Sequence, residues 1–128
     1  MPKRPQLKLR HIFVFGSNRQ GRHGLGAALT ARNEHGAIYG QARGLQGNSY
    51  AIVTKELRQG YKAVTISEIA LEVAAFLDFA AENPEWIFDV APIGCGLAGF
   101  VPSQIAPLFN DVPSNVRLPP EFQQALSQ

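Results

Sequence analysis

The chain has 128 residues, 45% of them apolar and 17% charged, a composition typical of one globular domain and not of a disordered or fibrous protein. Its one cysteine, Cys95, excludes an internal disulfide and a CxxC zinc motif, which favours a reducing compartment. No apolar run reaches the roughly 20 residues that cross a bilayer, and the first residues lack the apolar stretch of a signal peptide. We therefore expect a cytoplasmic protein with no membrane partner.

Charge and glycine are both unevenly distributed. The formal net charge is only +2, yet residues 1–63 hold 11 Lys/Arg and two acids, whereas residues 64–128 hold one Arg and eight acids. This asymmetry indicates an anion-facing first half. Eight of the 12 glycines fall within residues 16–47 and three within residues 94–99, so two glycine-rich loops with a special backbone are expected.

The chain is predicted to form one domain with a short basic extension. Residues 1–10 carry two prolines and four basic residues without any period, which predicts a flexible arm or an edge segment. The single domain is expected over residues 11–128. Its first strand is predicted at residues 12–15, a continuous β-prone run of the kind buried on both faces of a sheet.

A helix follows the first glycine loop. The spacing of apolar residues predicts this helix from Leu25 to about Glu34, with Gly36 as its left-handed cap. Residues 36–48 show no period and predict a long surface loop. Residues 50–55 alternate weakly and predict a second strand.

The second half opens with a strong helix signal. Thr65 and Glu68 have the spacing of a capping box, in which hydroxyl and carboxylate satisfy each other's backbone donors. Apolar residues then recur at three- and four-residue steps to about Glu82, which predicts an amphipathic helix with an acidic face. The acidic face contains Glu68, Glu72 and Glu82.

Strands and helices alternate to the end of the chain. Residues 86–91 predict a third buried strand that runs into the second glycine loop at residues 93–100. A short helix over 102–109, a strand over 115–118 and a helical turn over 121–126 complete the prediction. Repeated strand–loop–helix units predict an α/β fold, a compact three-layer sandwich of a mostly parallel mixed sheet with helices on both faces.

Both glycine loops connect a strand to a helix, which places them where open α/β sheets bind ligands. Glycine lets the backbone approach a ligand closely, and the N–H groups at a helix start carry partial positive charge. The two loops together therefore predict a cradle for two linked phosphates. The side chains of Arg19, Arg22, Arg43 and Lys55 add positive charge around the same rim, or are solvated surface residues.

With these segments in this order, the sequence resembles the macrodomain, the ADP-ribose-binding module, over about residues 11–110. The most specific match is Pro92-Ile93-Gly94-Cys95-Gly96-Leu97-Ala98-Gly99-Phe100. A looser match, the pattern FGSNxxGxHGxGAA at residues 15–28, is similar to a compact group of phage and bacterial proteins.

The resemblance implies that Asn18 lies near the distal ribose of ADP-ribose. It also implies that residues 23–28 and 94–100 face the phosphates, with Phe100 against the distal ribose or on the adenine side. The family's aspartate that reads the adenine amino group has no counterpart upstream of His11. The candidate ligand-binding residues are Gly16, Ser17, Asn18, Gly21, Arg22, His23, Gly24, Leu25, Gly26, Ala27, Ile93, Gly94, Cys95, Gly96, Leu97, Ala98, Gly99 and Phe100.

Asn18 and His23 are the candidate catalytic residues for hydrolysis of an ADP-ribosyl or ribose-phosphate linkage, because such a reaction needs a positioned water and a proton acceptor. Asp89 is a third candidate or a loop-ordering acceptor. His23 also suits a binding or structural role, in which its imidazole hydrogen-bonds a phosphate or the loop. Cys95, between two glycines, is interpreted as a small filler rather than a nucleophile. We expect no cofactor and no metal.

The leading hypothesis is thus a protein that binds an ADP-ribose-type nucleotide, with or without hydrolysis. A phage-type sponge for a nucleotide immune signal would carry the same sequence features. A nucleic-acid-binding module based on the basic first half is an alternative, although basic and aromatic residues are not interleaved as a stacking platform. A structural or interaction protein whose glycine loops are only tight turns is a further alternative.

Overall fold

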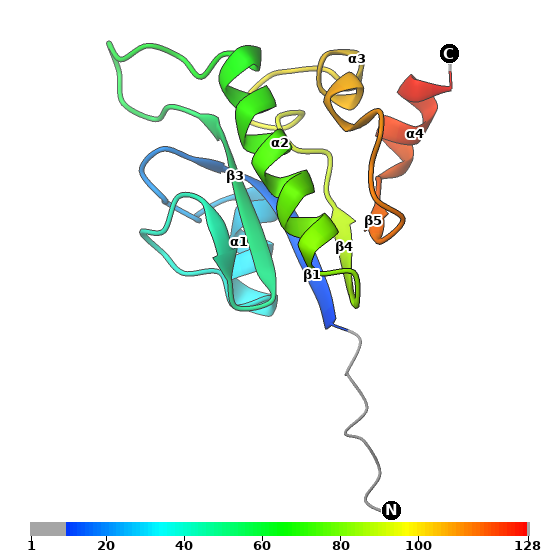
Figure 1. Cartoon of the computed structure of the whole chain (residues 1–128). Helices are drawn as coiled ribbons and strands as arrows, with labels where there is room; N and C mark the ends of the chain where they lie inside the picture. Colours follow the sequence, from blue (N-terminus) through cyan, green and yellow to red (C-terminus); the bar gives the residue numbers. More distant parts are fainter. Residues whose placement is uncertain (1–9, 128) are drawn as a thin grey trace, which may run out of the picture.

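A computed structural model describes residues 10–127 (Figure 1). The arm expected over residues 1–10 lies outside that range, apart from Arg10, which is the first residue of strand β1. Within the described range the chain forms a five-stranded sheet with strand order β2-β3-β1-β4-β5.

The sheet is mixed and mostly parallel. Its central strand β1 (Arg10–Asn18) runs parallel to β3 (Ser49–Lys55) and to β4 (Trp86–Val90). The short β5 (Val116–Arg117) is parallel to β4, and the edge strand β2 (Gly44–Gln46) is antiparallel to β3. Because β1, β3 and β4 are parallel neighbours, their carboxyl ends meet at one edge of the sheet.

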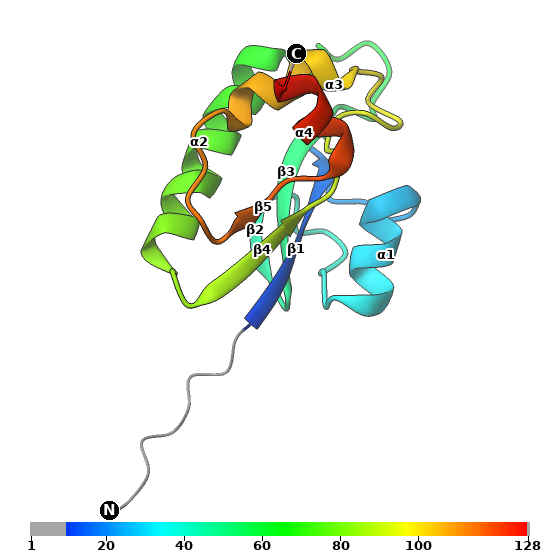
Figure 2. The ribbon, with the colours of Figure 1, turned by 90° about the vertical axis from the view of Figure 1, so that its right-hand side faces the viewer.

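Helices cover both faces of the sheet (Figure 2). The side chains of β1 alternate between the faces: Ile12 and Val14 join a large core with α2 (Ile66–Glu82), whereas Phe15 joins a smaller core with α1 (Gly26–Glu34). The segments α3 (Pro102–Ile105), η1 (Ala106–Phe109) and α4 (Pro120–Leu126) add buried side chains to the larger core. The predicted three-layer α/β sandwich is confirmed.

The capping box predicted for α2 is present. The Thr65 hydroxyl accepts from the Glu68 amide at 3.2 Å, and the Glu68 carboxylate accepts from the Thr65 amide at 3.1 Å. The helix buries Ile69, Val73, Phe76 and Ala80, which follow the predicted spacing.

Two predicted segments differ from the structure. The loop expected over residues 36–48 contains β2, which pairs with β3 after a turn between Gln46 and Ser49. The single helix expected over residues 102–109 is two helical segments, α3 and the 3₁₀ turn η1. Pro107 lacks the backbone N–H that would continue the α-helical ladder, so the helix changes type.

Candidate functional site

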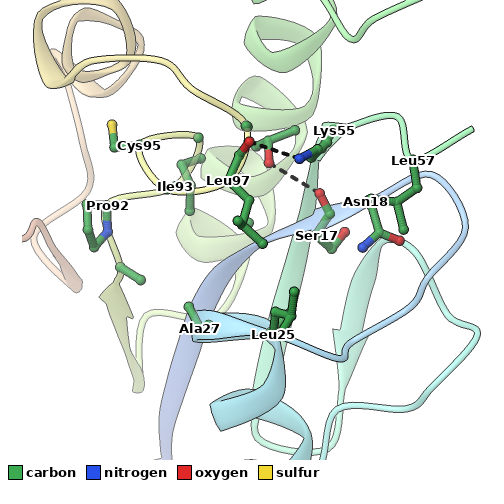
Figure 3. Close-up of a pocket in the computed structure, with 18 residues that line it drawn as sticks. Ser17, Asn18, Leu25, Ala27, Lys55, Leu57, Pro92, Ile93, Cys95 and Leu97 are labelled. Atoms are coloured by element: carbon green, nitrogen blue, oxygen red, sulfur yellow. Dashed lines mark hydrogen bonds between the residues drawn. The ribbon is translucent and has the colours of Figure 1, made fainter. Parts of the chain in front are cut away.

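A cavity of about 630 Å³ opens at the edge of the sheet where β1, β3 and β4 end (Figure 3). Residues 16–18 and 25–28 line it from one side and residues 91–98 from another, so both predicted glycine loops contribute, and the end of β3 lines it from a third side. The volume lies within the range of small-molecule sites. The lining residues are Gly16, Ser17, Asn18, Leu25, Gly26, Ala27, Ala28, Thr54, Lys55, Leu57, Ala91, Pro92, Ile93, Gly94, Cys95, Gly96, Leu97 and Ala98.

The first loop is closed by Asn18 and opens into helix α1. The Arg22 amide donates to Asn18 Oδ1 at 2.8 Å, and Asn18 Nδ2 donates to the Arg22 carbonyl at 2.9 Å. Leu25 is the N-cap residue of α1, and its apolar side chain accepts no hydrogen bond from the amides of the first turn. The first-turn amides of α1 are therefore left for a ligand or water. Gly26 has a φ of 57°, and an added Cβ there would meet open space.

The second loop is a tight turn held by hydrogen bonds within its own backbone. The Phe100 amide donates to the Gly94 carbonyl at 2.8 Å, and the Gly99 amide donates to the Gly96 carbonyl at 3.0 Å. Gly94 has a φ of 75°, and a Cβ there would lie 3.3 Å from both Ile105 Cδ1 and Phe100 Cδ2. Gly96, in contrast, faces open space. The second loop thus packs against the core at Gly94 and leaves room for a ligand at Gly96.

Gly16 lets the end of β1 approach the second loop. A Cβ at Gly16 would lie 3.1 Å from Thr54 Oγ1 and 3.3 Å from the Gly94 amide nitrogen. Thr54 in turn donates to the Ser17 carbonyl at 3.2 Å. The floor of the cavity is therefore packed closely around Gly16, by the Thr54 side chain and by the backbone of residues 93–94.

The end of β3 contributes Lys55, whose charged group lies at the cavity. Its ammonium donates to the Leu97 carbonyl at 3.0 Å, so β3 and the second loop are joined across the site (Figure 3). Cys95 is the other titratable group in the lining, and burial, with a smaller contribution from Glu121, raises the pKa of its thiol. The cysteine is therefore a neutral thiol at neutral pH, as its interpretation as a filler requires.

The structure brings most of the sequence-predicted site residues together. Twelve of the 18 line the cavity, and they come from both loops. Those that line it are Gly16, Ser17, Asn18, Leu25, Gly26, Ala27, Ile93, Gly94, Cys95, Gly96, Leu97 and Ala98. Those outside its lining are Gly21, Arg22, His23, Gly24, Gly99 and Phe100. Phe100 packs against the larger core.

His23 is buried beneath the first loop, with 0% of its surface exposed. Its Nε2 lies 3.0 Å from the Gln41 carbonyl oxygen and 3.1 Å from Gln46 Oε1. Its ring packs edge-on against the Phe15 ring, with 5.2 Å between the ring centroids. Both neighbours of Nε2 are acceptors, so Nε2 carries the hydrogen. This placement suits the structural role of His23, which ties the first loop to residues 41–46.

Several lining residues escaped the sequence prediction. Thr54, Leu57, Ala91 and Pro92 all line the cavity. For Thr54 and Leu57 a signal existed, because a strand parallel to β1 must end at the same edge. The cations Arg19 and Arg43 have other partners: Arg19 Nη2 lies 2.7 Å from Glu68 Oε2, and Arg43 Nη2 lies 3.0 Å from Glu72 Oε2.

No cluster of three or more His, Cys, Asp or Glu suited to a metal ion occurs among residues 10–127. None of the helices described above has both the length and the apolar character needed to cross a bilayer.

The fold has a counterpart among solved structures. A macrodomain protein from Streptomyces coelicolor superposes with a TM-score of 0.54 over 90% of this chain and 90% of its own, at 20% sequence identity. No family model matches the sequence, and no curated protein matches it either. The likeness is thus one of structure. This chain has a macrodomain-like fold.

Proposed function

We propose that the cavity binds ADP-ribose or a related nucleotide that contains a diphosphate. The observation that carries this proposal is the convergence of the two glycine loops on one cavity. The resemblance of these loops to those of macrodomains supports the choice of ligand, and the macrodomain-like fold is consistent with it.

In this proposal the diphosphate lies between the start of α1 and the second loop. The uncapped first turn of α1 supplies amides and the positive end of the helix dipole, which favours an anion by about 0.3–1 kcal/mol. Gly26 and Gly96 leave open space on the two sides, so main-chain amides reach the phosphates without a side chain between them. Lys55 adds a positive charge at the end of β3.

We propose binding without turnover. Hydrolysis needs a group that takes a proton from water. Asn18 is engaged at both polar atoms with the backbone of Arg22, and His23 is buried under the loop. Lys55 donates a hydrogen bond to the Leu97 carbonyl, and Cys95 is a neutral thiol. The site is therefore suited to holding a nucleotide, as a protein that sequesters a nucleotide signal would do.

A charge placed at the start of α1 tests the phosphate position. Ala27 is exposed, lines the cavity and is the second residue of α1, so Ala27→Glu puts a carboxylate where the phosphates would bind. An acid in the first turn also stabilises a helix, so the variant should fold. We expect the affinity for ADP-ribose, measured by titration calorimetry, to fall at least tenfold.

The matched control is Thr30→Glu, which adds the same charge to an exposed position of α1 outside the cavity lining. This control should bind ADP-ribose as the unchanged protein does. Equal affinities of Ala27→Glu and the unchanged protein would exclude the proposed phosphate position. Incubation with an ADP-ribosylated peptide and with ADP-ribose 1″-phosphate should release no product. Release that disappears in Asn18→Ala would instead identify an enzyme.

A further inference from the structure

The polar side chains that line the cavity are already engaged within the protein. The Ser17 hydroxyl donates to the Ala42 carbonyl, and the Thr54 hydroxyl donates to the Ser17 carbonyl. Asn18 pairs with the backbone of Arg22, and Lys55 donates to the Leu97 carbonyl. A base that enters the cavity thus meets polar side chains that are already oriented by partners within the protein. Their directions are set by these internal hydrogen bonds and not by the edge of a base.

Apolar side chains at the cavity are exposed to solvent. Leu25 is 66% exposed, Leu97 is 64% exposed and Leu57 is 38% exposed, and each comes from a different segment of the lining. In Figure 3 Leu25 and Leu97 point toward one another across the cavity, and Leu57 lies beside Asn18. We call these three residues the leucine rim.

Burial of the leucine rim by a ligand would be favourable, at about 25 cal/mol for each Å² of apolar surface removed from water. The three side chains surround a concave site of about 630 Å³, which suits a small molecule better than the flat surface of a protein partner. A purine ring has two flat faces that can pack against apolar side chains.

We propose that the site accepts nucleoside diphosphate sugars with little regard to the base, because the leucine rim contacts the faces of the base and leaves its edge unread. This inference rests on the proposed function and specifies its ligand class. The main-chain amides select the diphosphate, and the leucine rim selects a flat ring.

A comparison of bases tests the inference. ADP-ribose, its hypoxanthine counterpart and its guanine counterpart are titrated against the full chain, with inorganic pyrophosphate as a probe that lacks a base. We expect the three nucleotides to bind within threefold of one another and pyrophosphate at least tenfold more weakly. A tenfold or greater preference for adenine over hypoxanthine would overturn the inference and leave the proposed function standing. If neither ADP-ribose nor pyrophosphate binds, the proposed function itself fails.

Variants of the rim test its role directly. Leu25→Ala, Leu57→Ala and Leu97→Ala should each weaken ADP-ribose and its hypoxanthine counterpart by the same factor, about fivefold, and leave pyrophosphate unchanged. Leu71→Ala is the matched control, since Leu71 is 75% exposed on α2 and outside this cavity. Unchanged nucleotide affinity in all three rim variants would exclude the rim as the base contact.

Discussion

Glycine serves two distinct purposes in this chain. At some positions the missing side chain lets two segments of backbone meet: a Cβ at Gly21 would lie 2.5 Å from the Gly40 carbonyl carbon. At others, such as Gly96, the space is open and faces the cavity. The first kind stabilises the fold, and the second kind keeps room for a ligand.

Gly21 and Gly60 allow the cost of backbone strain to be separated from the cost of a steric clash. Both have a positive φ, 66° and 79°, but a Cβ at Gly60 would meet open space. Gly60→Ala should cost about 1 kcal/mol, from backbone strain alone. Gly21→Ala should cost about 2 kcal/mol more, because the loops at residues 21 and 40 must move apart. Urea denaturation measures both, and equal losses would show that the contact with Gly40 is unimportant.

The clustering of glycines in the sequence was informative, whereas the contacts of single residues were harder to predict. The concentration of glycines in residues 16–47 indicated a special loop, yet the partner of Gly21 lies 19 positions away and carries no signal in the sequence. The same is true of His23, whose acceptors Gln41 and Gln46 belong to the segment expected as a long surface loop. Local patterns show that a residue is special, whereas its contacts depend on the tertiary fold.

Between elements, a set of ion pairs ties residues 56–68 to the end of β1. Arg58 Nη2 lies 2.7 Å from Glu56 Oε1, and Arg19 Nη1 lies 3.6 Å from the same oxygen. Arg19 also pairs with Glu68 at the start of α2 and donates to the Lys62 carbonyl at 2.6 Å. The connection that carries Leu57 to the cavity is therefore held by charge.

This arrangement predicts a loss of stability in acid. Hydrogen bonds from Arg58, together with Gln20, lower the pKa of Glu56 from 4.5 to about 2. A folded-state pKa below the unfolded value stabilises the fold fully above pH 4.5, and that stabilisation is lost as pH falls toward 2. We expect Tm, followed by circular dichroism, to fall over this window, and to fall less in Glu56→Gln.

Glu85→Gln is the control for the acid series, because Glu85 is an exposed glutamate in the turn before β4. Its Tm should follow that of the unchanged protein throughout the titration. A Glu56→Gln profile as steep as that of the unchanged protein would show that other carboxylates cause the acid loss. Glu68, whose pKa is lowered chiefly by its hydrogen bond with Arg19, is the next to test.

Regular elements were predictable where their periodicity was strong. The helix expected to end near Glu82 and the strand expected from residue 86 are close to α2 and β4. The edge strand β2 was missed, because a segment of three residues is too short to show alternation. Its strand conformation comes from pairing with β3, which is a tertiary property.

For the whole molecule, the two helical layers bury very different amounts of apolar surface. Among the described residues, 17 buried residues form the core under α2, α3, η1 and α4. Only five form the core under α1: Phe15 and the four alanines Ala28, Ala31, Ala37 and Ala51. Alanines let α1 lie close to the sheet, but they contribute little hydrophobic free energy. The α1 layer, whose first turn forms part of the proposed phosphate site, is therefore the less stable of the two.

This imbalance predicts where the molecule opens first. In native-state hydrogen exchange, we expect the amides of α1 to exchange faster than those of α2, since local opening of α1 exposes less apolar surface. ADP-ribose should slow exchange most at residues 26–28 and 96–98, because a ligand held by these amides must leave before they open. Equal exchange rates in α1 and α2 would contradict the stability argument. Protection by ADP-ribose confined to α2 would contradict the binding geometry, and the two results are independent of each other.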